Sequence, residues 1–327
     1  MRKIITLSLS IILLTSLTAC AAKDVTLTLY TSMKESLVLV LIEDFEEQNP
    51  GITVDVRIDG AGALMELIES ERAAGRIEAD MLWTSEIPDF YQMKDEGLLM
   101  QYRPVGADEV YNSLEETEDY FIGARLGTMG IAYNTDIIST PPSSWTDLFG
   151  PEYTDSFAVA NPLTSGTAMM AVVLLNEALG PDFFKALSDN GAYIGGGSTA
   201  VVDAVARGEA AACLAVDYIA YDKIDSGSPM AISYPPEMIV IPSPMAIFKD
   251  SGQAAAAKKF ADYLLSAAAQ EQIATKGTLP VMPGIAVPDK YNIPTASEAA
   301  VRAIVVNEAE ILGRQADVLA MFMEIME

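Results

Sequence analysis

The sequence has no histidine, only two cysteines and few basic residues. Its 327 residues include 20 Lys or Arg and 46 Asp or Glu, so the formal net charge at pH 7 is −26. The absence of His removes the commonest general base and the commonest transition-metal ligand, and it excludes a Ser-His-Asp or Cys-His arrangement. The acidic balance argues against nucleic acid or an anionic membrane surface as a partner, because both require a basic face.

Recognisable catalytic machinery is also missing. The sequence contains no Gly-rich P-loop with Lys. It has many carboxylates, but no pair of them lies in a sequence context typical of a glycosidase. We therefore expect a protein that is not an enzyme and uses no cofactor. A secreted hydrolase is the alternative from the catalytic class, although it would have to work without a His base. Half of the residues are hydrophobic, which allows a large core, and the length suits about two domains.

The N-terminus has the pattern of an export signal. Two basic residues precede the apolar run 4–14, and LTAC (17–20) follows, which is the order of segments in a secretory signal. The run is too short to be a comfortable permanent anchor. Because a Cys after small residues resembles the lipoprotein box, we predict a signal peptide over 1–19 and lipidation of Cys20. An ordinary signal beside a chance Cys is less favoured, since Cys213 is the only other cysteine and exported proteins often pair theirs.

One unit recurs along the chain: an apolar, often β-branched run ends in a small polar turn, and a helical pattern begins. Such units start near residues 25, 52, 80, 157, 192 and 211. Strands that alternate with helices predict an α/β fold with largely parallel sheets covered on both faces. The length predicts two such sheets, with a strand in 127–136 crossing between two lobes. A further strand is expected over 242–248, one long amphipathic helix over 254–277 and a helical tail over 297–327.

Small polar residues stand where the strands meet the helices. In open parallel sheets, ligands bind beyond the carboxyl ends of the strands. The first-turn amides of the helices there have no internal partner, so they hold anions without needing Lys or Arg. The candidate ligand-binding residues at these turns are Thr31, Ser32, Ser85, Ser165, Gly166, Thr167, Gly197 and Ser198. Simple helix capping is the alternative for each Ser, and a flexible surface loop is the alternative for the glycines at 195–197.

The segment VDYIAYD (216–222) provides a second group of candidates. Asp217 stands at a helix start, where it could accept a hydrogen bond from a ligand amine or hydroxyl or simply cap the helix. Tyr218 and Tyr221 are one helical turn apart and share a face. They could bind a hard trivalent cation, donate hydrogen bonds to a phosphonate, or only pack in the core.

An ordered set of segments carries a resemblance to a known family. The segments are LTLYTSMKES, FEEQNPGITVDV, EADMLWTSEIPDFYQMKDEGLL, MGIAYNT, SSWTDLFGPEY, ANPLTSGTA, GEAAACLAVDY and PSPMAIFKDSGQAAAAKKFADYLLSAAAQEQ. They span about residues 25 to 272 and resemble the extracellular solute-binding proteins of bacterial ABC importers. The branch in question covers binders of ferric iron, of phosphonates (including 2-aminoethylphosphonate) and of organophosphates.

The resemblance implies two lobes that close on a solute about two crossing hinge strands, and delivery to a membrane permease powered by a separate ATPase. Lobe 1 is expected to comprise 20–128 and 238–278, and lobe 2 to comprise 129–237 and 279–327. The lipid on Cys20 would anchor the exported protein to the cell membrane, on its periplasmic or extracellular face, as its only membrane contact. We expect a monomer that binds no nucleic acid. A sensor or adhesin lipoprotein that kept the fold and lost transport is another alternative.

The resemblance also bears on the solute. Ferric binders of this family hold the metal with adjacent tyrosines in the stretch that matches 216–222, often with a His near the first strand, but here Ile219 follows Tyr218 and His is absent. Phosphonate and sugar-phosphate binders hold the anion on the helix starts that match 31–32, 165–167 and 197–198. The resemblance therefore favours a small phosphonate or organophosphate. Asp217 or Glu86 would bind its amine or hydroxyl, and ferric iron on Tyr218 and Tyr221 is the alternative.

Overall fold

A computed structural model describes residues 24–111, 114–304 and 308–327, with the side chains of 308–312 left aside. The predicted signal peptide and Cys20 lie outside these residues. The strands are β1 Val25–Thr31, β2 Ile52–Ile58, β3 Met81–Trp83, β4 Ile122–Asn134, β5 Phe157–Val159, β6 Tyr193–Ile194, β7 Ala212–Val216, β8 Met230–Ser233 and β9 Ile239–Ile247. The helices are α1 Glu35–Gln48, α2 Ala61–Ala73, α3 Ile87–Asp95, α4 Gly166–Leu179, α5 Pro181–Asp189, α6 Ser198–Ala206, α7 Asp217–Asp225, α8 Ala254–Leu264, α9 Ala267–Thr275, α10 Ala296–Arg302 and α11 Glu308–Met326.

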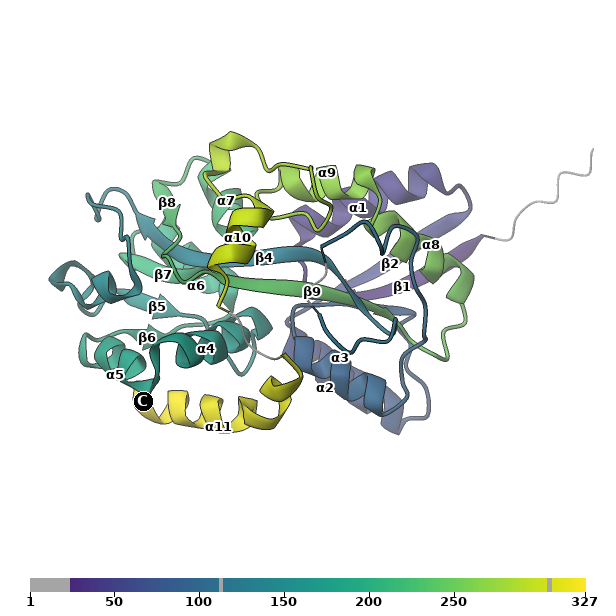
Figure 1. Cartoon of the computed structure of the whole chain (residues 1–327), viewed down its shortest axis with the longest axis horizontal. Coiled ribbons are helices and arrows are strands. Elements are labelled where there is room, and N and C mark those ends of the chain that lie inside the picture. Colours follow the sequence, from purple (N-terminus) through teal and green to yellow (C-terminus); the bar gives the residue numbers. More distant parts are fainter. Residues whose placement is uncertain (1–23, 112–113, 305–307) are drawn as a thin grey trace, which may run out of the picture.

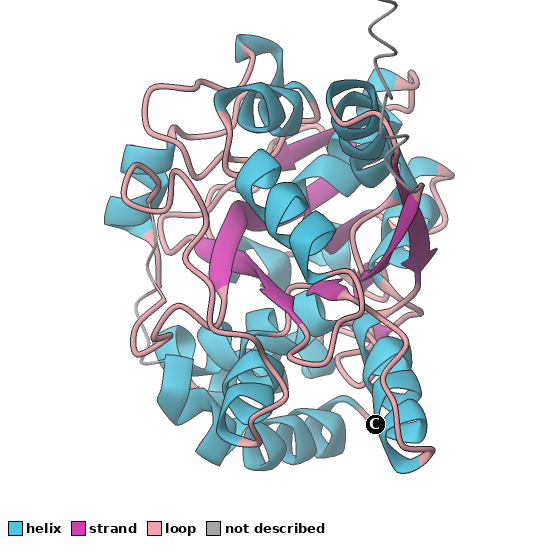
Figure 2. Ribbon diagram, turned by 90° about the vertical axis from the view of Figure 1, so that its right-hand side faces the viewer, coloured by secondary structure: helices cyan, strands magenta, loops and turns pink. Residues whose placement is uncertain are grey.

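The strands form one mixed sheet with helices on both faces, which confirms the predicted α/β class (Figures 1 and 2). Its order is β2-β1-β3-β9-β4-β7-β5-β6, and β8 pairs with β4. The pairs β1–β2, β1–β3, β5–β7 and β5–β6 are parallel, whereas β9 and β4 in the middle pair antiparallel with their neighbours.

The expectation of two separate sheets is wrong, because β4 is long enough to belong to both halves. Its residues 122–129 pair with β9, and its residues 129–133 pair with β7. All 13 residues of β4 are buried. The chain therefore crosses between the halves inside one continuous hydrogen-bonded ladder.

The expected long helix over 254–277 is also wrong, since the structure has two helices there, α8 and α9. Ser266 interrupts the helical pattern and is the N-cap of α9, where its hydroxyl accepts a hydrogen bond from the backbone N–H of Ala269 at 3.3 Å. Ser side chains favour such helix starts over helix interiors. The predicted helical tail is likewise divided into α10 and α11.

The core continues through both halves of the sheet. Trp83 and Trp145 are buried in it, as is Cys213 on β7, a free thiol. Helix α4 is apolar almost all round because it lies between the sheet and α11, which packs along α4, α5 and α3 (Figure 1). Within the described ranges, none of the helices has the length and apolar character to span a bilayer.

Candidate functional site

A cavity of about 530 Å³ lies where strands end and helices begin. The starts of α1, α2, α4 and α6 contribute to it, together with the turn after β3 and the first turn of α7. It is lined by Ser32, Met33, Lys34, Glu35, Ile58, Asp59, Gly60, Ala61, Ser85, Glu86, Arg125, Thr164, Ser165, Gly166, Thr167, Gly197, Ser198, Thr199, Ala200, Val216, Tyr218 and Ile219. Eight of the ten residues predicted to bind the ligand are therefore brought to one place.

A larger cavity of about 690 Å³ lies elsewhere, under the segment 279–297. Among the described residues that line it, Asp289 is the only charged one, and the others are mostly apolar or proline. None of the helix starts that line the smaller cavity contributes to the lining of this larger cavity. The smaller cavity is the better candidate because polar groups from several elements converge on it.

Three hydroxyls from two helix starts form a cluster on the wall of the smaller cavity. The Ser165 Oγ lies 2.8 Å from the Ser198 Oγ and 3.2 Å from the Thr167 Oγ1, and Thr167 Oγ1 lies 3.1 Å from Ser198 Oγ. Ser165 is also the N-cap of α4, where its hydroxyl accepts from the Ala168 N–H at 3.4 Å. Because hydroxyl hydrogens rotate, the cluster can turn its donors toward an anion while the two helix starts add their partial positive charge.

The turns after β1 and β3 supply the opposite wall. Ser32 lines it beside Ser85, whose hydroxyl lies 3.0 Å from the Ser243 hydroxyl on β9. Gly197, on the α6 side, has open space where a side chain would be. Ser85 is thus held by the sheet, whereas the hydroxyl cluster belongs to the helix starts.

Thr31 does not line the cavity, contrary to the prediction. Its side chain is fully buried; the hydroxyl donates to the Trp83 carbonyl at 2.7 Å and accepts from the Met33 N–H at 3.1 Å. The hydroxyl fastens the end of β1 to β3 and has no access to the ligand space.

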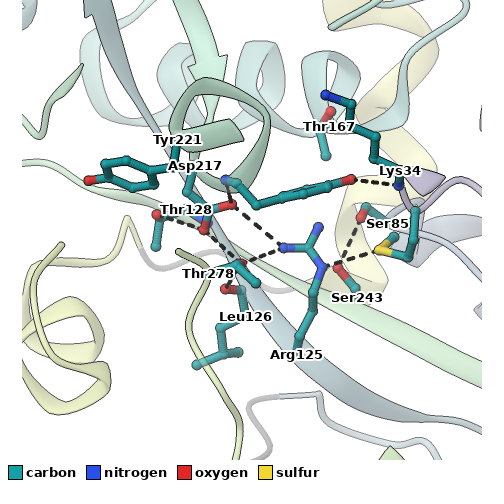
Figure 3. Close-up of polar contacts among 12 residues, drawn as sticks. Lys34, Ser85, Arg125, Leu126, Thr128, Thr167, Asp217, Tyr221, Ser243 and Thr278 are labelled. Atoms are coloured by element: carbon teal, nitrogen blue, oxygen red, sulfur yellow. Dashed lines mark hydrogen bonds and ion pairs between the residues drawn. The ribbon is translucent and has the colours of Figure 1, made fainter. Parts of the chain in front are cut away.

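Asp217 is also outside the cavity, so its predicted role as a ligand for a solute amine is wrong. Its Oδ2 accepts hydrogen bonds from the Thr128 N–H and hydroxyl at 2.8 and 3.0 Å and from the Thr278 hydroxyl at 2.8 Å. Burial raises the pKa of Asp217, while the nearby charge of Arg125 and these donors oppose the rise. The carboxylate is an internal anchor between β4 and α7 (Figure 3).

Tyr218 and Tyr221 do not face the same space. Tyr218 lines the cavity, and its hydroxyl accepts from the Lys34 N–H at 3.2 Å. Tyr221 is directed away from it (Figure 3); its hydroxyl donates to the Tyr291 carbonyl and accepts from the Tyr234 hydroxyl at 3.2 Å. Burial raises the pKa of both Tyr218 and Tyr221, which disfavours the phenolate form that a metal requires.

Arg125 is a cavity residue that the sequence analysis missed. It is fully buried on β4, with Nη1 2.7 Å from the Thr278 hydroxyl and 3.8 Å from Oδ1 of Asp217, and Nε 3.2 Å from the Met33 sulfur. Its guanidinium lies 4.7 Å from the ring centroid of Tyr218. A lone Arg in the otherwise apolar run IGARLGTMGIAYN was the signal that could have found it.

Lys34 is a second such residue. It is the only basic residue in the turn between β1 and α1, and its Nζ lies 2.5 Å from Oδ2 of Asp222 on α7. Together with the hydrogen bond from the Lys34 backbone N–H to Tyr218, this ion pair connects the turn after β1 to α7, which lies nearly 190 residues later in the sequence.

Glu86 carries the most unusual group in the cavity. The residue is only 6% exposed, and its Oε2 has no hydrogen-bond partner in the described part of the chain. Burial raises the pKa of Glu86 to about 8, and the charge of Asp89 adds to the rise. Its carboxylate lies against the start of α4 so closely that a Cβ added to Gly166 would be 1.4 Å from Oε1. Only glycine leaves room for it there.

We expect Gly166→Ala to lower the free energy of unfolding by about 1–3 kcal/mol, because the added methyl overlaps the Glu86 carboxylate and overpacks the site. Urea unfolding measures the change. Gly197→Ala is the matched control, since it opens α6 in the same cavity and its added Cβ meets nothing within 4 Å. Equal losses in the two variants would contradict the expected clash.

The comparisons with known proteins agree on one family. The family model for bacterial extracellular solute-binding proteins matches residues 30–271. The chain belongs to this family. Among curated proteins, this solute-binding protein is similar to the phosphoglycerate transport regulatory protein PgtC of Salmonella typhimurium, with 24% identity over 278 positions that cover 81% of this chain and 68% of PgtC.

Solved structures of binding proteins superpose well on this solute-binding protein. Iron-bound HitA from Pseudomonas aeruginosa matches with a TM-score of 0.77 at 25% identity, covering 92% of this chain and 99% of HitA. AfuA from Actinobacillus pleuropneumoniae, with fructose-6-phosphate bound, matches with a TM-score of 0.75 at 21% identity, covering 92% and 98%. These matches confirm the predicted two-lobed binding-protein fold. Family membership makes the chain an exported solute-binding protein of an ABC importer, with a small solute and a permease as its partners.

Proposed function

We propose that this protein captures a small solute that carries a phosphonate or phosphate group. The observation that carries the proposal is the cluster of Ser165, Thr167 and Ser198, whose hydroxyls lie within 3.2 Å of one another at the starts of two helices. Helix starts and small hydroxyls are the donors that hold phosphoryl oxygens without a formal charge. The name of the relative PgtC, which refers to phosphoglycerate, is consistent with such a solute.

The remaining cations of the cavity suit an anion of modest charge. Arg125 and Lys34 line it, and each is already near one carboxylate, Asp217 or Asp222. Donors from the backbone and hydroxyls act at hydrogen-bond range, whereas the acidic outer surface is screened within about 10 Å. The negative net charge is therefore compatible with binding of an anion.

The solute is held between two lobes. Lobe 1 comprises residues 20–128 and 238–278, and lobe 2 comprises residues 129–237 and 279–327. Contacts across the cavity support this division. Lys34 of the first part pairs with Asp222 of the second, and a Cβ on Gly60 would lie 3.1 Å from the Thr164 carbonyl. Such contacts are those that a closing hinge motion would make and break.

Lipidation at Cys20 would keep the monomer at the membrane beside its permease, as the only membrane contact, on the periplasmic or extracellular face. Acylation of this kind holds a protein stably at the bilayer surface when more than one chain is attached. The solute would then pass to the permease when the lobes open.

A ligand panel tests the proposal. Thermal unfolding of the purified protein is followed with 2-aminoethylphosphonate, ethylphosphonate, 3-phosphoglycerate, glucose and ferric citrate. A phosphonate or phosphate ester at 100 times its Kd should add about 2.7 kcal/mol to the free energy of unfolding, and glucose should add nothing. A stabilisation by ferric citrate alone, with a visible tyrosinate-to-iron absorption band, would replace the proposal with ferric binding.

Ferric iron is the weaker candidate because Tyr221 does not reach the cavity that Tyr218 lines. In the described ranges, no group of three or more His, Cys, Asp and Glu side chains is arranged to hold a metal ion. The iron in HitA is a property of that protein, which shares 25% identity with this chain.

A further inference from the structure

Arg125 has more hydrogen-bond donors than partners. Its Nη1 donates to the Thr278 hydroxyl at 2.7 Å, and its Nε donates at 3.2 Å to the Met33 sulfur, which is a weak acceptor. The other terminal nitrogen, Nη2, has no hydrogen-bond partner among the residues that the structure describes, and Figure 3 draws no contact to it. Because the side chain is fully buried and lines the cavity, these free donors mark a place for an acceptor on the solute.

Asp217 compensates the charge of Arg125 only in part. Nη1 of Arg125 lies 3.8 Å from Oδ1 of Asp217, which is longer than a hydrogen bond. The Asp217 carboxylate is already satisfied by neutral donors. These are the N–H and hydroxyl of Thr128, the hydroxyl of Thr278 and the N–H of Tyr218. The guanidinium therefore keeps both charge and donors for an acidic group from outside the protein.

The surroundings hold the guanidinium in place. It lies 4.7 Å from the ring centroid of Tyr218 and close against Gly127, where an added Cβ would be 3.0 Å from Nη1 and 3.2 Å from Nη2. The starts of α1 and α2 line the same cavity, and their N-caps, Lys34 and Gly60, make no side-chain cap hydrogen bond. First-turn amides without a cap add partial positive charge to the cavity. Arg125 is thus fixed in a setting that favours an anion.

The hydroxyl cluster and Arg125 are separate groups of donors. The cluster lies at the starts of α4 and α6, whereas Arg125 is on β4, and Figure 3 draws no contact between Thr167 and Arg125. A phosphoryl group held by the cluster leaves Arg125 available for another part of the same solute. A cavity of about 530 Å³ accommodates a small solute with two acidic groups. One partly compensated cation suits the single charge of a carboxylate better than the larger charge of a second phosphate.

We propose that Arg125 is a specificity-determining residue that binds a carboxylate of the solute, apart from its phosphoryl group. The substrate class is then a small phosphonate or phosphate ester that also carries a carboxylate. This inference rests on the proposed function and narrows it. The N–H groups of Nη2 make a charge-assisted hydrogen bond to the carboxylate, while Asp217 keeps its neutral donors.

The experiment is calorimetry on the full mature protein with two matched pairs of ligands. The pairs are 3-phosphonopropionate with propylphosphonate, and 3-phosphoglycerate with glycerol 3-phosphate, and only the first member of each carries a carboxylate. In whichever pair binds, the carboxylate ligand should bind about tenfold or more tightly, the ratio that one charge-assisted hydrogen bond gives. Because a carboxylate and a guanidinium both stay ionised between pH 6 and 8, the ratio should stay nearly constant over that range.

A double variant tests the residue itself. Arg125→Met combined with Asp217→Asn removes both partners of the buried pair, so that no uncompensated charge is left in the core. It should lose the preference for the carboxylate. It should bind the ligand without a carboxylate within about twofold of the wild type, as for independent sites. Arg103→Met is the matched control, because it removes an exposed positive charge outside the cavity and should keep the preference.

The outcomes are distinguishable. Equal affinities of the wild type for both members of each pair, or equal weakening of both members by the double variant, would overturn the role of Arg125 and leave the proposed function in place. Tighter binding of 2-aminoethylphosphonate than of 3-phosphonopropionate would do the same. A folded wild-type protein that binds no phosphonate and no phosphate ester would overturn both. Circular dichroism and the unfolding midpoint of the double variant establish that any loss of binding belongs to a folded protein.

Discussion

Arg125→Ala is expected to lower the free energy of unfolding by about 3–5 kcal/mol, the usual result of removing one partner from a buried ion pair. The change leaves the fully buried Asp217 without the charge 3.8 Å from its Oδ1, and it removes the donor to Thr278 and the cation over the Tyr218 ring. Burial already raises the pKa of Asp217 against the influence of Arg125. Urea unfolding at pH 7 measures the loss.

Arg207→Ala is the control for Arg125→Ala. Arg207 also pairs with a carboxylate, Glu209, but both side chains are more than half exposed, so the expected change is at most about 1 kcal/mol. The pH dependence gives a further check. Without Arg125, the pKa of Asp217 rises further above its unfolded value, and stability should then decline with rising pH over a wider range above that unfolded value. Identical unfolding midpoints for Arg125→Ala and the wild type would show that the buried pair contributes nothing.

The second large effect is on binding. Ser165→Ala combined with Thr167→Ala should weaken binding of 2-aminoethylphosphonate by several kcal/mol at most, since each hydrogen bond to a charged group contributes about 1.5–3 kcal/mol. Both hydroxyls lie within 3.2 Å of Ser198 in the cluster that we assign to the anion. Calorimetry on the double variant measures the loss directly.

Thr275→Ala serves as the control for the double variant, because its exposed hydroxyl only donates to the Gln272 carbonyl within α9. It should leave the affinity unchanged. Ser165 also caps α4, so the unfolding midpoint of the double variant is recorded beside its affinity. A stable double variant with wild-type affinity would remove the hydroxyl cluster from the binding site.

The sequence was sufficient to predict the alternating strands and helices and most of the cavity. Ser32, Ser85, Ser165 and Ser198 meet because the carboxyl ends of neighbouring strands share an edge of the sheet, a rule that needs no coordinates. The starts of β1, β2 and β5 followed from their apolar runs, whereas β4 begins at Ile122 rather than near residue 127, and β8 was not predicted. The prediction of two sheets was wrong because local sequence patterns do not show that β4 pairs with β9 in one half and with β7 in the other, which joins both halves in one hydrogen-bonded sheet.

The errors at the site concern the direction of side chains at element ends. Asp217 and Tyr218 are successive residues in the first turn of α7, where they point in different directions around the helix, so Tyr218 lines the cavity while Asp217 is buried. At the end of β1, the alternation of side chains along extended backbone takes Thr31 inward and leaves Ser32 at the wall. The position of a residue next to a strand end does not show whether its side chain faces the cavity or the core. Arg125 and Lys34 were missed because their partners are far away in the sequence.

The order of the strands bears on how the chain is made. Strand β3 ends at residue 83, but its neighbour β9 begins only at residue 239. During synthesis the first quarter of the protein must therefore wait, with one edge of its sheet open, until more than 150 further residues have left the ribosome. Pairing over such separations is slow. The late arrival of β9 therefore keeps the sheet incomplete until most of the chain has been made, which favours export of the chain before it has folded.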